Sequence, residues 1–275
     1  MATEPTPSTC FHHPDRETGR HCTRCGRPAC SDCLRDAAVG AQCFECVNEA
    51  APSTRERVAL RLRGEKLLAT KAIIGVNVVA FLAIALKDGR IDGGGPTSTM
   101  LAVYGPAVHN GEWWRLFTSS IVHYGLLHIF FNMLVLWLVG RVLEPGAGPL
   151  RFTEIYVVSV LAGSAGALLL SPHASTGGAS GGVFGVAAAA TLVMQRQGVR
   201  FWDTGFGPLL VINLLFSFYD RNVSVGGHIG GLIGGALAAE AMLAARRAEQ
   251  PKLGVLGAGF VGVAAVMIGF AAAAR

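Results

Sequence analysis

Charged residues are scarce in this sequence. Asp, Glu, Lys and Arg together make up 15% of the 275 residues, whereas hydrophobic residues make up 51%. Soluble domains usually carry about 25% charged residues, so this composition argues against an ordinary soluble protein. The first 50 residues also lack an apolar run, so we expect no cleavable signal peptide. The scarcity of charge instead predicts a protein embedded in a lipid bilayer.

Seven apolar blocks follow the polar first part of the chain. They span residues 70–86, 125–143, 153–171, 181–195, 206–218, 224–245 and 253–274. A helix that faces lipid needs about 20 residues to cross the bilayer. Because the blocks at 181–195 and 206–218 are shorter, we expect these two helices to be surrounded by the others or tilted. The blocks predict an all-α polytopic membrane protein, with residues 50–69 as a basic linker or juxtamembrane helix.

Lys and Arg are distributed unevenly between the apolar blocks. They precede the first block and then occupy every second connection, while the opposite connections carry few. The residues of this set are Arg55, Arg57, Arg61, Arg63, Lys66, Lys71, Arg141, Arg151, Arg196, Arg200, Arg246, Arg247 and Lys252. Because cytoplasmic loops are enriched in Lys and Arg, we expect a cytoplasmic N-terminus and an external C-terminus. The net charge of +5 then reflects topology and does not indicate nucleic-acid binding.

Four polar residues in the apolar blocks share one predicted depth. His128 and Asn132 lie in the first two turns of the second block, Ser180 is at the start of the fourth, and His228 is near the start of the sixth. These blocks enter from the outer side, and a helix rises about 1.5 Å per residue, so all four residues fall in the outer half of the bilayer. Ionisable groups inside a membrane are functional candidates by default. A histidine can also activate a serine hydroxyl as a nucleophile.

Other interpretations of these residues are weaker. Gly-x-Ser-x-Gly also marks the nucleophile elbow of soluble α/β-hydrolases, which needs a preceding strand, but Ser180 follows a polar loop and begins an apolar helix. The glycines around His228 indicate a packing face of small residues, which would also let His228 approach Ser180. A metal transporter would need carboxylates or several histidines within the spans, and the blocks contain almost none.

Four segments resemble those of the rhomboid intramembrane serine proteases. They are WWR at 113–115, HYGLLHIFFNM at 123–133, GASG at 178–181 and GHIGG at 227–231. The resemblance covers residues 65–245 and implies a six-helix catalytic bundle, here residues 70–245, with 253–274 as the extra helix of a six-plus-one form. It implies a Ser–His dyad without an aspartate, and no carboxylate is near Ser180 or His228 in the sequence. It also implies a multi-pass protein of the bacterial cell membrane that cleaves transmembrane proteins without a cofactor.

Chemistry and the resemblance assign the same roles to the polar residues. Ser180 would attack the scissile carbonyl, with His228 as general base and then general acid. The Ser180 amide lies at a helix N-terminus, where unpaired N–H groups and the helix dipole favour an oxyanion. His128 and Asn132 share one helix face and could supply two more donors, as residues at these positions do in rhomboids. His123 also matches a family histidine, and we expect it to have a structural or water-organising role.

Other segments resemble membrane-associated or mobile parts of the family. Residues 88–118 are too long for a simple turn and resemble the first loop, which lies partly in the outer leaflet. Residues 206–218 and 219–224 resemble the gate and cap that admit substrate. Phe184 stands where some rhomboids have a tyrosine packed against the catalytic histidine. The alternative function is a catalytically silent protein that binds transmembrane helices, but the presence of all four site residues argues against it.

Cysteine is absent from the chain after residue 46. All seven cysteines lie within residues 1–49, where six form three C-x₂-C pairs and Cys10 forms a C-x₂-H pair with His13. Eight such ligands suit two tetrahedral zinc ions, and a reducing cytoplasm argues against disulfides. We expect alternate pairs to share a metal, which gives the sets Cys10, His13, Cys30 and Cys33 against Cys22, Cys25, Cys43 and Cys46. His12 or His21 could replace His13.

The segment 1–49 resembles a B-box-like zinc finger. A chain of this length cannot stabilise a core by itself, so two structural zinc ions are the expected staple. We expect this domain to bind a cytoplasmic protein partner or to regulate the enzyme, with nucleic-acid binding as the alternative.

Overall fold

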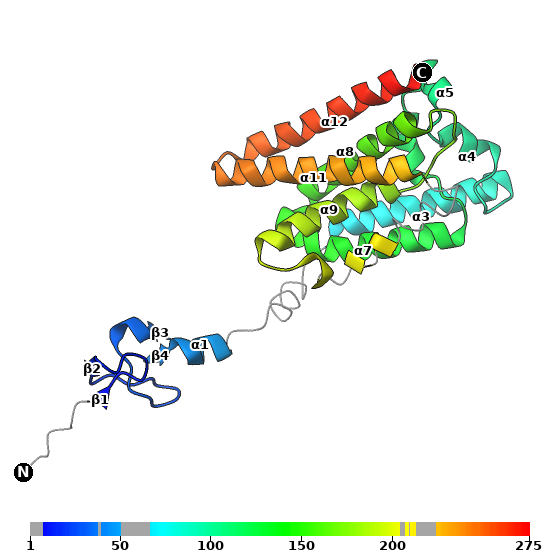
Figure 1. The fold of residues 1–275 in the computed structure, drawn as a ribbon. Helices are drawn as coiled ribbons and strands as arrows, with labels where there is room; N and C mark the ends of the chain where they lie inside the picture. Colours follow the sequence, from blue (N-terminus) through cyan, green and yellow to red (C-terminus); the bar gives the residue numbers. More distant parts are fainter. Residues whose placement is uncertain (1–7, 38–39, 51–66, 204–206, 209, 213–223) are drawn as a thin grey trace, which may run out of the picture. The chain divides into compact units, whose positions relative to one another are not determined.

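The computed structural model describes residues 8–37, 40–50, 67–203, 207–208, 210–212 and 224–275. The chain divides into two compact units, Met1–Arg63 and Gly64–Arg275. Figure 1 shows short strands and short helices in the first unit and long helices in the second. We refer to these units as the head and the bundle.

Cysteine side chains form the core of the head. The strand pairs are β1 (Ser8–Thr9) with β2 (Glu17–Thr18) and β3 (Leu34–Asp36) with β4 (Ala41–Cys43), both antiparallel; the helices are η1 (Ser31–Cys33) and α1 (Phe44–Ala50). Six cysteines are buried together with Ala29 and Leu34. Such a core contains little apolar surface, so a unit of this size needs a staple such as a metal. This architecture fits the expected zinc-stapled domain.

Long helices form the bundle. They are α3 (Leu68–Asp88), α7 (Leu126–Ala147), α8 (Pro149–Leu170), α9 (Ser180–Arg196), α11 (Val225–Arg247) and α12 (Pro251–Ala273). Within the described residues, five helices are long and apolar enough to cross a membrane, and α9 is shorter, with 17 residues. The predicted all-α membrane fold is confirmed. Most of the predicted gate and cap, residues 206–218 and 219–224, lies outside the described residues.

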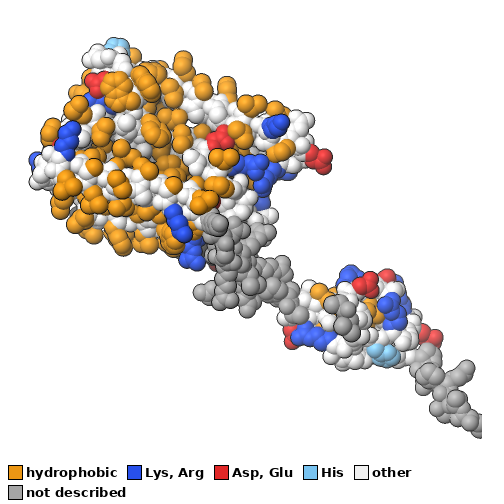
Figure 2. All heavy atoms as spheres, turned by 180° about the vertical axis from the view of Figure 1, so that it is seen from behind, with side chains coloured by type: hydrophobic (Ala, Val, Ile, Leu, Met, Phe, Trp, Pro, Cys, Tyr) orange, Lys and Arg blue, Asp and Glu red, His pale blue; other side chains and the backbone are white. Residues whose placement is uncertain are grey.

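The short helix α9 is surrounded by other helices, as predicted for the block 181–195. Ten of its residues are buried, and it packs against α7, α8 and α11. In contrast, α3 and α12 expose large hydrophobic side chains such as Leu86 (85% exposed) and Phe260 (73% exposed). Hydrophobic side chains cover most of the face of the bundle that Figure 2 shows. An apolar surface of this extent is suited to contact with lipid.

Glycines let α11 pack closely between α8 and α9. A β-carbon at Gly226 would overlap the carbonyl oxygen of Gly166 on α8, and one at Gly231 would overlap the carbonyl oxygen of Gly181 on α9. Close approach through small residues is typical of helices in membranes. The contact brings the start of α11 against the start of α9.

The connection between α3 and α7, residues 89–125, is a folded structure. It contains α4 (Pro96–Leu101), α5 (Gly105–His109), α6 (Arg115–Thr118) and η2 (Ser119–Ile121). The Arg115 guanidinium is buried and donates to the carbonyl oxygens of Thr99 (2.6 Å) and Ala102 (2.9 Å). It also pairs with Glu112 at 2.7 Å. The arginine of the WWR segment therefore holds the α3–α7 connection together.

Glu144, near the end of α7, caps the start of α3. Its carboxylate is buried and accepts hydrogen bonds from the Ala69 N–H (2.8 Å), the Thr70 N–H (2.8 Å) and the Thr70 hydroxyl (2.6 Å). The first N–H groups of a helix have no partner within the helix. Glu144 satisfies two of them and places a carboxylate at the positive end of the helix dipole.

Candidate active site and metal centres

Ser180 is the first residue of α9. Its amide lies in the first helical turn, where N–H groups lack partners within the helix and the dipole favours negative charge. The preceding Gly178 has a φ of 140°, a conformation that favours glycine. This glycine allows the turn that leads into α9.

His228 lies in the first turn of α11 and is buried. Its ring stacks on Phe184, with the ring centroids 4.2 Å apart and the planes at 22°. Phe184 follows Ser180 by four residues, and residues at this spacing lie on the same face of a helix. The His228 ring therefore packs on the face of α9 that carries Ser180. The helix start is fixed by Ser224, whose hydroxyl accepts from the Gly227 N–H at 3.0 Å.

His128 approaches Ser180 from α7. A β-carbon at Gly178 would lie 3.1 Å from Nε2 of His128 and 3.5 Å from Oγ of Ser180, so both groups flank this glycine. Nδ1 of His128 accepts a hydrogen bond from the Tyr124 N–H at 3.2 Å. A neutral imidazole with Nδ1 as acceptor carries its proton on Nε2. His128 therefore presents an N–H donor to the space beside Ser180.

Asn132 and His123 lie close to His128. Asn132 is buried one turn further along α7, and its Nδ2 donates to the His128 carbonyl at 3.0 Å. This bond uses one of the two N–H groups of the amide. His123 is also buried: its Nε2 accepts from the Ala179 N–H at 3.5 Å, and its ring lies edge-on to that of His128, with centroids 5.2 Å apart. The four predicted site residues and His123 therefore gather at one end of the bundle.

A cavity of about 30 Å³ lies beside Ser180. Its polar lining includes Ser119, Ser164 and His128. This volume is sufficient for a water molecule with several polar partners. The Ser164 hydroxyl donates to the Leu116 carbonyl at 2.7 Å and lies 3.2 Å from the Ser119 hydroxyl. Neither serine could be recognised from the sequence, because a single serine at either position belongs to no recognisable pattern.

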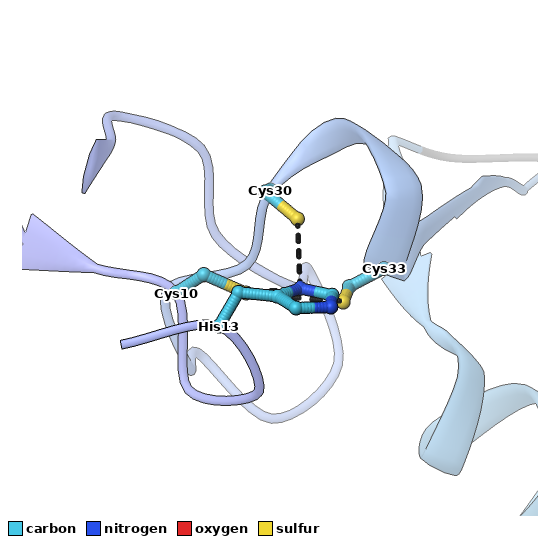
Figure 3. Close-up of side chains that lie close together, drawn as sticks. All are labelled: Cys10, His13, Cys30 and Cys33. Carbon is cyan, nitrogen blue, oxygen red and sulfur yellow. Dashed lines mark hydrogen bonds between the residues drawn. The ribbon is translucent and has the colours of Figure 1, made fainter. Parts of the chain in front are cut away.

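Among the described residues, two groups of Cys and His side chains lie close enough to hold a metal ion, and both are in the head. One group is Cys10, His13, Cys30 and Cys33, and the other is Cys22, Cys25, Cys43 and Cys46. The ligand atoms of each group lie within 4.8 Å of one another. Figure 3 shows Nδ1 of His13 directed at the sulfurs of its group, 3.8 Å from Cys10, 3.4 Å from Cys30 and 3.3 Å from Cys33. The structure thus brings together the sets that the alternate pairing predicts.

The distances fit tetrahedral zinc. Zn–S bonds of about 2.3 Å place two sulfurs about 3.8 Å apart, and a Zn–N bond of about 2.0 Å places nitrogen and sulfur about 3.5 Å apart. The sulfurs of Cys10 and Cys33, and those of Cys25 and Cys43, are 3.8 Å apart. The Cys43 N–H donates to the Cys22 sulfur at 3.2 Å, and this bond, together with others from Cys25 and Arg24, lowers the pKa of Cys22 to about 6. A lowered pKa favours the thiolate, which is the form that binds metal.

The alternative histidine ligands lie elsewhere in the head. His12 stacks on Phe11, with centroids 5.2 Å apart, and on Phe44, with centroids 4.7 Å apart. His21 forms a β-bridge with Pro28. Neither histidine belongs to a ligand group, so the geometry favours His13.

Comparison with known proteins identifies relatives of the bundle. The family model of the Rhomboid domain matches residues 110–245. The chain is 36% identical over 225 residues to the Rhomboid protease GluP of Bacillus subtilis, which covers 76% of this chain and 43% of GluP. It is 33% identical over 138 residues to the Putative rhomboid protease YdcA of the same organism, which covers 49% of this chain and 69% of YdcA.

Relatives named as inactive also match the chain. The Inactive rhomboid-related protein 2 of Caenorhabditis elegans is 32% identical over 155 residues, which covers 52% of this chain and 44% of that protein. The chain therefore spans less than half the length of GluP and of this relative. Because one fold can carry active and inactive sites, activity has to be argued from the side chains at the site.

Proposed function

The chain belongs to the rhomboid family, and we propose that it is an intramembrane serine protease with a Ser180–His228 dyad. It would hydrolyse peptide bonds in or near the membrane-spanning segments of other proteins. The observation that supports this proposal is that two histidines, His228 and His128, approach Ser180 from different helices. His228 packs on the face of α9 that carries the serine, and His128, on α7, directs its Nε2 to the space beside Ser180.

The chemistry proceeds by acyl transfer. Ser180 Oγ attacks the scissile carbonyl carbon while His228 accepts the hydroxyl proton, and His228 then donates that proton to the departing amine. Water attacks the resulting ester, with His228 again as base, and Ser180 is regenerated. The cavity beside Ser180, which the hydroxyls of Ser119 and Ser164 line, is large enough for this water.

Three donors would stabilise the oxyanion of the tetrahedral intermediate. They are the Ser180 N–H at the start of α9, Nε2–H of His128 and the second Nδ2–H of Asn132. A preorganised donor of this kind contributes about 3 kcal/mol to transition-state stabilisation. These steps need no cofactor.

The dyad is tested by labelling and cleavage together. Ser180→Ala and His228→Ala should each abolish cleavage of a single-span reporter and labelling by a fluorophosphonate, while expression and membrane insertion stay unchanged. The double variant should be no less active than either single variant, because groups that act as a unit are not additive. Ser171→Ala and His173→Ala are matched controls, since both residues are exposed. Cleavage by Ser180→Ala at the wild-type rate would exclude a serine protease.

The second candidate is a catalytically silent protein that binds transmembrane helices. The relative named as inactive supports considering it. The two candidates differ in one measurement. A silent protein would bind a single-span peptide but would not react with the fluorophosphonate in detergent in which an active rhomboid is labelled.

We also propose that the head binds two structural zinc ions and is a docking domain for a cytoplasmic protein. The two ligand groups and their distances support the metal sites, and the distribution of Lys and Arg supports a cytoplasmic N-terminus and an external C-terminus. Reporter fusions at the two termini test the orientation: a periplasm-dependent phosphatase should be active at the C-terminus alone.

A further inference from the structure

The C-terminal end of α12 packs against the α3–α7 connection. Figure 1 shows this end of α12 beside α5. Ala272 is fully buried in a cluster that also contains Val103, Val108 and Leu116 of the connection. A β-carbon at Gly269 would lie 3.3 Å from Cδ2 of Leu116, which is a tight contact. The small residues at the end of α12 therefore set how closely this helix approaches the connection.

The same connection holds the loop that leads to Ser180. Val103 and Thr176 exchange two backbone hydrogen bonds of 2.9 Å. The Gly178 N–H donates to the Ser119 carbonyl at 2.8 Å. Val103 thus belongs to the apolar cluster that contains Ala272 of α12, and its backbone pairs with the loop before the nucleophile.

A second path joins α12 to the site through Leu116. The Leu116 side chain contacts α12, and its carbonyl accepts from the Ser164 hydroxyl, which lies 3.2 Å from the hydroxyl of Ser119. Ser119 in turn holds Gly178, two residues before Ser180. Packing at the end of α12 is therefore connected to the nucleophile by a few short contacts, although none of the described residues that line the cavity belongs to α12.

We propose that α12 positions the nucleophile, with Gly269 and Ala272 as the positioning residues. This inference rests on the proposed protease function. A displacement of α12 shifts Val103 and Leu116, and through them the loop that carries Ser180. Because a misplacement of about 1 Å can cost about 100-fold in rate, a small displacement is expected to affect kcat. Such a displacement acts on the position of the Ser180 hydroxyl, so kcat is expected to change more than KM.

Two Gly→Leu variants of the same helix provide the test. Gly269→Leu forces a side chain against Leu116, whereas Gly259→Leu adds the same side chain where no atom lies within 4 Å. Both changes raise helix propensity equally. In full-length protein, Gly269→Leu should lower kcat and the rate of fluorophosphonate labelling by about 10–100-fold, with KM nearly unchanged. Gly259→Leu should match the wild type. Equal kcat for the two variants would overturn the proposal.

A compensating substitution distinguishes a local clash at Leu116 from a general failure of the variant to fold. Leu116→Ala removes the side chain that Gly269→Leu meets, so adding it to the Gly269→Leu variant should restore part of the lost kcat. Residues in contact show this non-additivity, whereas independent sites simply add. A further loss of kcat in the double variant would contradict the proposed path. Gly269→Ala, which adds only a methyl group, should fall between wild type and Gly269→Leu.

The controls separate this inference from the proposed function. If neither the wild type nor Gly259→Leu is labelled or cleaves the reporter, the protease function itself fails. If both are active and Gly269→Leu equals them, only the role of α12 fails.

Discussion

Replacing Glu144 by Gln tests how the bundle holds the start of α3. The carboxylate accepts three hydrogen bonds from Ala69 and Thr70 in a buried site. Gln has one acceptor oxygen, so its NH₂ group must face at least one donor of α3. An unsatisfied buried donor costs about 1–3 kcal/mol, and the loss of a carboxylate at a helix N-terminus costs up to about 2 kcal/mol in a buried geometry. We expect Glu144→Gln to lower the free energy of unfolding by about 2–4 kcal/mol.

The assay is denaturant unfolding of the purified protein in detergent, followed by tryptophan fluorescence. Glu154→Gln is the matched control, because Glu154 is only half-buried on α8, and a change of about 0.5 kcal/mol or less is expected there. Thr70→Val, which removes the hydroxyl donor alone, should cost about 1 kcal/mol. The reasoning would be refuted if Glu144→Gln and Glu154→Gln had the same midpoint.

Further predictions concern the oxyanion site and the head. His128→Ala and Asn132→Ala should each lower kcat by about 10–1000-fold and raise KM less; reporter kinetics that show a change in affinity alone would assign both residues to substrate binding. Metal analysis should find close to two zinc ions per chain, and chelation should unfold the head because metal binding supplies its folding free energy. His13→Ala should lose one zinc ion while His12→Ala retains both, and the opposite result would identify His12 as the metal ligand in place of His13. Deleting residues 1–50 should leave cleavage in detergent largely intact, and a collapse of activity would show that the head controls the bundle.

Features with a local signature could be predicted from the sequence. The apolar blocks predicted the long helices to within a few residues, because the hydropathy of a membrane span is a property of about 20 consecutive residues. The metal ligands occur in close pairs, so their spacing predicted the two sets of cysteines, whereas His13 was singled out from His12 and His21 by the structure. Ser180 and His228 were recognisable because a polar residue is conspicuous in an apolar block and because short motifs surround each of them.

Contacts between distant segments were not predictable in this way. Glu144 meets Thr70 across 74 residues, and the Ser119 carbonyl accepts from the Gly178 N–H, which is also far away in the sequence. Neither contact leaves a periodic pattern, because each depends on one side chain or one carbonyl. The fifth span and the cap were predicted from hydropathy and resemblance, and they remain predictions because most of these residues lie outside the described part of the chain.

By itself, the sequence predicted which segments enter the membrane, which residues can bind metal and which are candidates for catalysis, because these predictions rest on residue types and their spacing. Only the tertiary structure decided how these groups face one another. The Tyr124 N–H occupies Nδ1 of His128 and so leaves Nε2 as the donor beside Ser180. Likewise, the end of α12 shares an apolar cluster with Leu116 and Val103 of the α3–α7 connection, a contact that no sequence pattern indicates. The direction in which a side chain points and the groups that it contacts depend on how the helices pack, and helix packing is a property of the whole bundle.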